Sequence, residues 1–266
     1  MCRTASGAED MNGTLIPVHS VIERAPGALA QQMVNFEFSG GFFRKGHYTV
    51  LLIALVLGLF VLPPVVLGRP GLSLLLRVAI TFVFFAACYA IAANQRAFRV
   101  TIALAIVAVA AGWLSEFVTH PLLPGLASGL AAAFFLWTVL LLLKHVLGRG
   151  SVTLDRLFGA ICIYLLLGLA AAEVFALIYH VDPNSFAVSE ALRSRIGHGL
   201  TDEARSILTY YSFVTLTTVG YGDVSPVSLG ARSMAALEAV VGPLYLAILI
   251  ARLVSLMDLR SKTRDS

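Results

Sequence analysis

Charged residues are scarce in this chain of 266 residues. Asp, Glu, Lys and Arg make up 13% of it, and hydrophobic residues make up 58%. A soluble globular domain has about twice that share of charged residues, so the composition excludes this class and indicates a protein that crosses a membrane several times. The three cysteines exclude a disulfide framework, because Cys88 and Cys162 lie inside apolar segments.

The chain also lacks the residue patterns of an enzyme. No nucleophile is paired with a base, and no group of cysteines and histidines has the spacing of metal ligands. We therefore expect no catalytic residue, no enzymatic activity, no cofactor and no nucleic-acid partner.

Long apolar segments dominate the sequence instead. A membrane-spanning helix needs about 20 apolar residues, and six segments qualify: 48–68, 71–94, 97–118, 122–147, 155–180 and 229–257. Pro63-Pro64 is predicted to break or kink the outer end of the first segment. A polar stretch at 181–203 and a short amphipathic helix follow the fifth segment. No internal repeat is visible.

Positive charges predict the orientation of these segments. They gather before the first segment, between the second and third, between the fourth and fifth, and at the end of the chain, at Arg44, Lys45, Arg96, Arg99, Lys144, Arg149, Arg156, Arg260, Lys262 and Arg264. Six spans put all four groups on one side, which the positive-inside rule makes cytoplasmic. We expect a multi-pass protein of the cell membrane with both termini in the cytoplasm, and the residue bias is typical of a bacterial inner membrane.

The most informative motif lies just before the last apolar segment: Thr218-Val219-Gly220-Tyr221-Gly222-Asp223. A pair of glycines two residues apart is commonly a turn, and a phosphate-binding loop is a second use of such glycines. That loop, however, lies between a strand and a helix of a soluble α/β unit. Here the motif lies between two membrane-length apolar segments, which disfavours both alternatives.

The motif resembles the selectivity filter of the potassium channel family. In such a filter, backbone carbonyls replace the water around the ion, which requires alternating backbone conformations that glycine adopts at little cost. The resemblance implies that potassium binds at Thr218, Val219, Gly220 and Tyr221, with Gly222 completing the filter. Because one filter strand cannot enclose an ion, it also implies a homotetramer.

The same resemblance implies an all-α membrane fold of six transmembrane helices with a re-entrant pore helix and the filter between the fifth and sixth. The residues agree locally: Thr201 is a candidate N-cap, and the acidic residues that follow suit the positive end of a helix over Asp202–Thr217. The pair Tyr210-Tyr211 resembles the aromatic cuff of the family. Tyr210 is within reach of Asp223, and plain packing is the alternative for both rings.

The last apolar segment holds three further candidates. Gly242 lies where many potassium channels have a hinge glycine, and Pro243 removes a helical hydrogen bond, so the pair predicts either a gating hinge or a static kink. Glu238 is an ionisable residue inside a span, which marks it as a functional candidate. It is predicted to support the filter through Ser212, Thr215 or Thr217, to face the cavity, or to be a structurally satisfied acid.

The first four spans lack a voltage sensor, because the fourth has no Arg or Lys before Lys144. The predicted organisation is a cytoplasmic tail at 1–47, a sensor-like membrane domain without sensor charges at 48–150, a pore domain at 151–257 and a short tail at 258–266.

We expect a potassium-selective channel that conducts passively in the lipid bilayer and is not gated in the manner of voltage-gated channels. A subunit of a potassium uptake transporter and a non-conducting membrane sensor are the alternatives. The gating stimulus is not predicted.

Overall fold

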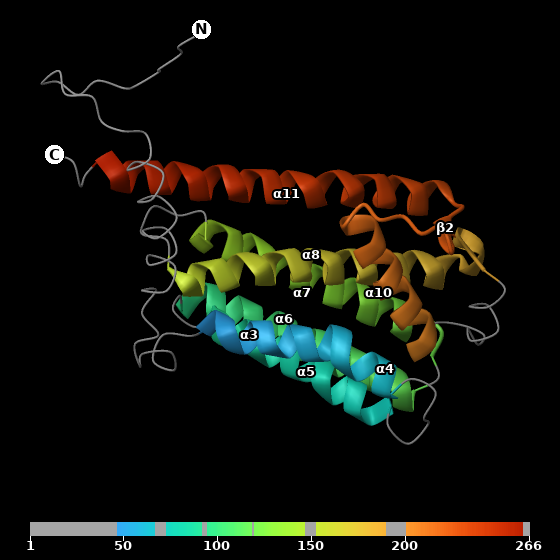
Figure 1. Cartoon of the computed structure of the whole chain (residues 1–266). Helices are drawn as coiled ribbons and strands as arrows, with labels where there is room; N and C mark the ends of the chain where they lie inside the picture. The colour runs from blue at the N-terminus through green and yellow to red at the C-terminus, as the bar shows by residue number, and fades with distance from the viewer. Residues whose placement is uncertain are drawn as a thin grey trace, which may run out of the picture. The chain divides into compact units, whose positions relative to one another are not determined.

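The structure, a computed structural model, describes residues 47–66, 73–91, 95–118, 120–146, 153–189 and 201–262. Of the predicted N-terminal tail only residue 47 falls within these ranges, and the last four residues of the chain fall outside them. The elements in chain order are α3 (His47–Val56), η1 (Leu57–Val61), α4 (Leu62–Val66), α5 (Ser73–Ala90), α6 (Gln95–Phe117), α7 (Leu123–Val146), α8 (Leu154–Val181), η2 (Pro183–Ser185), β1 (Phe186–Val188), α10 (Asp202–Leu216), β2 (Val224–Pro226) and α11 (Leu229–Lys262) (Figure 1).

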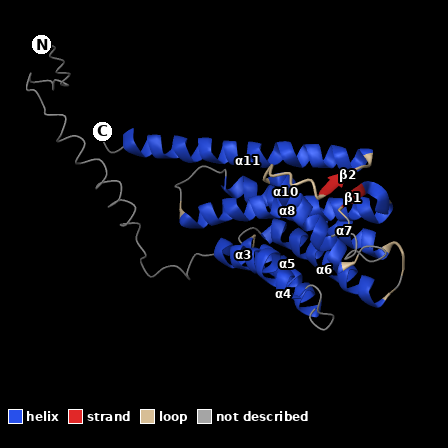
Figure 2. Ribbon diagram, turned by 45° about the vertical axis from the view of Figure 1, so that its right-hand side comes forward, coloured by secondary structure: helices blue, strands red, loops and turns tan. Residues whose placement is uncertain are grey.

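The membrane-length helices pack around α8. Helices α3, α5, α6 and α7 pack each against the next, and both α3 and α7 also contact α8. Helix α10 contacts α8 and α11, and α11 contacts α8 directly. Figures 1 and 2 show α11 on the opposite side of α8 from α3 and α5. Aromatic rings join α5 to α7, where the ring of Phe84 stacks on that of Phe134 at a centroid distance of 4.4 Å.

Within the described residues, five helices are long and apolar enough to cross a membrane: Tyr48–Val65, Ala97–Phe117, Leu123–Val146, Leu154–Val181 and Leu229–Arg252. Together with the composition, these helices make the chain a multi-pass membrane protein. The second predicted span appears as α5, whose apolar part, Leu74–Ala90, is shorter. A sixth crossing therefore stays a prediction.

The first helix does not break at its proline pair. It continues to Val66 as α4, and a π-helical turn, η1, lies directly before the prolines. In this turn the N–H of Leu62 donates to the carbonyl of Leu57, five residues back. Proline has no N–H to continue the usual pattern, so a wider turn precedes the pair where the sequence predicted a break. The predicted kink stays a prediction, since π-helical turns and prolines are both usual causes of kinks.

A small two-stranded ladder lies beyond the end of α8. Strands β1 and β2 are antiparallel, with Phe186 opposite Pro226 and Val188 opposite Val224 (Figure 2). The N–H of Ser189 extends the ladder by donating to the carbonyl of Asp223 at 2.9 Å. This ladder was not predicted, because strands of three residues are too short to show a periodic pattern. It fixes the residues that follow the glycine motif.

Helix α11 buries a single narrow stripe. Its buried residues recur at alternating steps of four and three, at Ala231, Ala235, Glu238, Gly242 and Tyr245. This stripe faces α8 and α10, the helices that α11 contacts. The rest of its described surface is largely exposed and apolar, for example at Leu237, Val240, Leu244 and Ile248.

Candidate functional site

Helix α10 begins as its sequence predicts. The Oγ1 of Thr201 accepts a hydrogen bond from the N–H of Ala204 at 3.2 Å, which caps the helix. Asp202 and Glu203 lie in the first turn, where the positive end of the helix dipole stabilises them. The helix ends at Leu216, one residue before the predicted end.

The chain turns back sharply at the end of α10. The carbonyl of Val214 accepts from the N–H of Val219 at 3.0 Å and from that of Gly220 at 3.4 Å, and the N–H of Thr218 donates to the carbonyl of Thr215 at 2.9 Å. These bonds use carbonyls that a helix end otherwise leaves without a partner. They attach the glycine motif directly to the last turn of α10.

The backbone of the motif alternates in conformation. Thr218, Gly220 and Gly222 have φ of 58°, 59° and 81°, and the two residues between them do not have positive φ. The alternation that the sequence predicted is therefore confirmed. A Cβ placed on either glycine would meet no atom within 4 Å, so in the single chain glycine is required there by conformation rather than by space.

Thr218 is the exception in this alternation, because it is a β-branched residue with positive φ. Such a conformation costs about 1–3 kcal/mol and persists only where its surroundings impose it. Strain of this kind is concentrated at functional sites. Thr218 is therefore held in place by the bonds at the end of α10, not by its own preference.

The side chains of the motif are exposed in the single chain. Val219 is 53% exposed and Tyr221 is 71% exposed. The ring of Tyr221 lies parallel to that of Tyr210, with a centroid distance of 6.5 Å and an angle of 3°. Apolar side chains left this open on a membrane protein face either lipid or another copy of the chain.

Tyr210 bonds Asp223, as its position in the sequence predicted. Its phenol oxygen lies 2.9 Å from Oδ2 of Asp223. Desolvation and then the hydrogen bond to Asp223 raise the pKa of Tyr210 to about 12. The phenol is therefore protonated at neutral pH and donates to the carboxylate, which ties the end of the motif back to α10.

Tyr211 lies away from the motif, in a buried cluster of three rings. Its centroid is 5.0 Å from that of Phe175 on α8 and 5.5 Å from that of Phe186 on β1, both in edge-to-face contact. The structure places Tyr211 where it packs α10 against α8 and the ladder. Its predicted role in an aromatic cuff stays a prediction.

Glu238 lies at the junction of three helices and is 3% exposed. Its Oε1 is 2.5 Å from the Oγ of Ser212 on α10, and that Oγ is 2.7 Å from the carbonyl oxygen of Gly168 on α8. Ser212 is one of the three partners that the sequence named for Glu238. The contact connects the inner face of α11 to the middle of α10.

Gly242 makes a close helix contact. A Cβ on this residue would collide with the carbonyl oxygen of Leu216, at the end of α10. Pro243 lies beside it in an unbroken α11, with an exposed side chain. The predicted hinge stays a prediction, and the structure gives Gly242 a packing role that the sequence analysis did not consider.

Two tyrosines that the sequence analysis missed support the same region. The hydroxyl of Tyr164 on α8 donates to the carbonyl of Leu216 at 3.2 Å, and that of Tyr245 on α11 donates to the carbonyl of Ala160 at 2.7 Å. The two rings stack at 6.2 Å. The sequence offered one signal for these two residues. Each phenol hydroxyl lies inside an apolar segment, where it needs a hydrogen-bond partner other than water.

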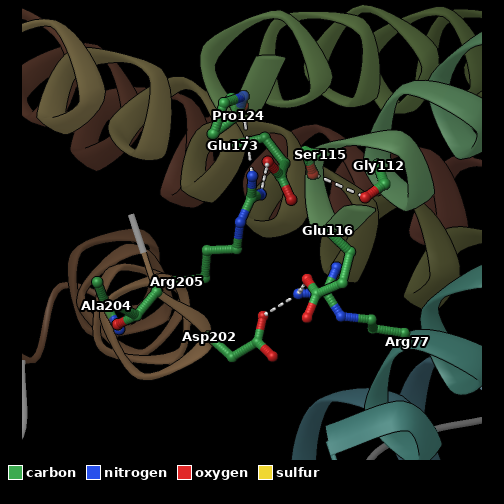
Figure 3. A network of polar contacts seen from close by, with 10 residues as sticks. Arg77, Gly112, Ser115, Glu116, Pro124, Glu173, Asp202, Ala204 and Arg205 are labelled. Atoms are coloured by element: carbon green, nitrogen blue, oxygen red, sulfur yellow. Dashed lines mark hydrogen bonds and ion pairs between the residues drawn. The ribbon is translucent and has the colours of Figure 1, made fainter. Parts of the chain in front are cut away.

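Ion pairs connect α10 to the other helices (Figure 3). Arg77 on α5 pairs with Glu116 on α6 and, at 3.1 Å, with Asp202 in the first turn of α10. Arg205 on α10 pairs with Glu173 on α8 at 3.0 Å. The sequence analysis placed Asp202 in the first turn of α10 and did not predict the ion pairs that join this helix to other helices. The structure brings these charges together around the start of α10.

A cavity of about 890 Å³ lies next to these ion pairs. Small residues before α5 and on α6, among them Gly58, Ala108 and Gly112, leave room for this cavity. Phe213 of α10 also lines it. Besides the ion pairs at its start, α10 contacts these helices through the ring of Phe213, whose centroid is 5.8 Å from that of Phe60. In the described part of the chain, no group of three or more His, Cys, Asp or Glu residues could hold a metal ion.

Comparisons with known proteins point to one region of the chain. Residues 169–258 match the model of a family described as "Ion channel". This range begins in α8 and takes in α10, the glycine motif and most of α11. The chain is 32% identical over 119 residues to "Protein LctB" from Bacillus caldotenax, which covers 45% of this chain and 81% of the relative. No solved structure matches the chain significantly.

Proposed function

Since this chain belongs to the ion channel family whose model matches its residues 169–258, we propose that it is a potassium-selective channel that conducts passively across a membrane. The observation that carries the proposal is the alternating backbone of Thr218, Gly220 and Gly222. Alternation of this kind allows successive carbonyls to point to the same side, which a cage of oxygens around a dehydrated cation requires.

The proposed site consists of backbone rather than side chains. The carbonyls of Thr218, Val219, Gly220 and Tyr221 replace the water of hydration of the ion. The C-terminal end of α10, directly before them, adds the negative end of a helix dipole, which stabilises a cation away from bulk water. The Tyr210–Asp223 bond then anchors the outer end of the filter.

The proposed assembly is a homotetramer. One strand of carbonyls covers one side of an ion, so four chains around an axis are needed to close the cage. The exposure of Val219, Tyr221 and the apolar side chains of α11 supports this, because these surfaces lie next to the proposed axis and are uncovered in the single chain. In this assembly α5 is the second of six spans and both termini are cytoplasmic.

Purified protein in potassium-loaded liposomes tests the proposal. We expect a potassium efflux that needs only a potassium gradient, and little sodium efflux under the same conditions. An efflux that requires a second ion gradient would identify a transporter instead. Absence of efflux from correctly assembled protein would favour a non-conducting sensor, and equal sodium and potassium efflux would refute the selectivity.

A further inference from the structure

In the buried contact between α8, α10 and α11, the hydroxyl of Ser212 lies close to two other oxygens but has a single hydrogen to donate. The Oγ of Ser212 lies 2.7 Å from the carbonyl oxygen of Gly168 and 2.5 Å from Oε1 of Glu238. Both distances are those of O–H···O hydrogen bonds. Each therefore needs a hydrogen between its two oxygens.

Counting hydrogens identifies the second donor. A serine hydroxyl has one hydrogen, and a backbone carbonyl only accepts. If Glu238 were ionised, one of the two contacts would hold no hydrogen, whichever way the hydroxyl of Ser212 turned. From this geometry we infer that Glu238 is a neutral carboxylic acid that donates to Ser212, which in turn donates to Gly168, and that loss of this proton disrupts the junction.

The second oxygen of Glu238 supports the neutral form independently. Its Oε2 is buried and has no hydrogen-bond partner among the described residues. An ionised carboxylate would place half of its charge on this oxygen, in an environment without water or a donor. Burying a charge in this way costs far more than burying a neutral acid.

The surroundings of Glu238 offer no compensating charge. In the described residues of α8 and α10, the titratable groups that interact electrostatically with it are Tyr164 and Tyr211. Both phenols are neutral at pH 7. No cationic side chain interacts with Glu238 within the described helices. A negative charge here would therefore be unpaired.

This junction lies directly behind the proposed filter. Ser212 is one helical turn before Leu216, whose carbonyl bonds Tyr164 and abuts Gly242. Removing the proton of Glu238 leaves either the Glu238–Ser212 contact or the Ser212–Gly168 contact without a hydrogen. Two oxygens then repel each other, and the junction of α8, α10 and α11 loosens. If the chain conducts potassium as proposed, loss of the Glu238 proton at alkaline pH stops conduction. Glutamine keeps the site neutral at every pH, and its amide N–H can donate to Ser212.

Infrared spectroscopy of the full-length protein in liposomes tests the protonation without relying on conduction. In protein with ¹³C-labelled glutamate, we expect an isotope-shifted carboxylic-acid carbonyl band at neutral pH that is absent from Glu238→Gln. Ser212→Ala should shift this band without removing it, because the acid loses its acceptor. Absence of such a band at neutral pH would overturn the inference.

Potassium efflux from the same liposomes tests the consequence. Wild-type efflux should be lost reversibly as the pH rises through the range in which the infrared band disappears, whereas Glu238→Gln should keep its efflux. The same pH profile in both proteins would overturn the switch. An intact band with no efflux at any pH would refute the proposed function instead, and it would support the protonation of Glu238.

Discussion

At the scale of single residues, the backbone angles of Gly220 and Gly222 require glycine in the proposed filter. An L-residue with a Cβ in the left-handed region costs about 1–2 kcal/mol, and the proposed tetramer repeats that cost in four chains. We expect Gly220→Ala or Gly222→Ala to abolish potassium efflux or to remove its preference over sodium. Liposome efflux with each cation measures this.

Gly112→Ala is the matched control for these two substitutions. Gly112 lies within α6 with no atom within 4 Å of a Cβ, and a helix interior favours alanine over glycine. This variant should conduct like the wild type. Unchanged selectivity in either filter variant would contradict the assignment of the filter.

Substitution of Gly242 distinguishes a role in helix packing from the predicted role as a hinge. A methyl group on this residue collides with the carbonyl of Leu216, so Gly242→Ala should destabilise the protein by about 1–3 kcal/mol through overpacking. Thermal unfolding of the purified protein in detergent measures this. Gly230→Ala in the same helix meets no atom within 4 Å and serves as the control. Unchanged thermal stability of Gly242→Ala combined with altered gating would favour the hinge.

At the scale of elements, structure that depends on neighbouring residues could be predicted from the sequence, and contacts between distant residues could not. Thr201 and the two acidic residues after it specify the start of α10 through hydrogen bonds within one turn, so the sequence predicted it. The close approach of Gly242 to Leu216 and the pairing of β1 with β2 join residues far apart in the chain. No local pattern encodes them, because their cause is the packing of whole helices.

One arginine bridges two of the first four helices to the start of α10. Arg77 bridges Glu116 on α6 and Asp202 on α10, while the space beside this bridge is a cavity. Arg77→Gln should lower stability by about 1 kcal/mol, since partly exposed ion pairs contribute little each. Arg77→Glu should cost more, because it gathers three carboxylates.

Thermal unfolding monitored by tryptophan fluorescence measures the effect of both Arg77 variants, since Trp113 lines the same cavity. Arg99→Gln, which changes an exposed arginine on α6, is the control for loss of a positive charge. If Arg77→Glu were as stable as the wild type, the bridge would have no structural role.

At the scale of the whole molecule, the first four helices are the part of the chain that the sequence predicted to be a sensor-like domain without sensor charges. The fourth predicted span, α7, has Lys144 near its end as its single Arg or Lys residue. Moving charge through the membrane field is what makes gating steeply dependent on voltage. We therefore expect a shallow conductance–voltage relation in planar bilayers. A relation as steep as that of voltage-gated channels would contradict this.

Assembly gives a second prediction for the whole molecule. The proposed filter strand and most of the described side chains of α11 are exposed in one chain, and the proposed cage needs four copies. Native mass spectrometry of protein released from membranes should show a tetramer as the conducting species. A monomer or dimer that conducts after reconstitution would refute the proposed pore.

The buried stripe of α11 has a mechanical consequence. Its steps of four and three residues average 3.5, and on a straight helix such a stripe drifts by about 20° every seven residues. A helix that keeps such a stripe buried along its length coils gently around its neighbours in the left-handed sense. Past Tyr245 no described side chain of α11 is buried. Beyond Tyr245 the contacts continue through partly buried residues such as Leu249, so α11 is held less firmly there than along its buried stripe.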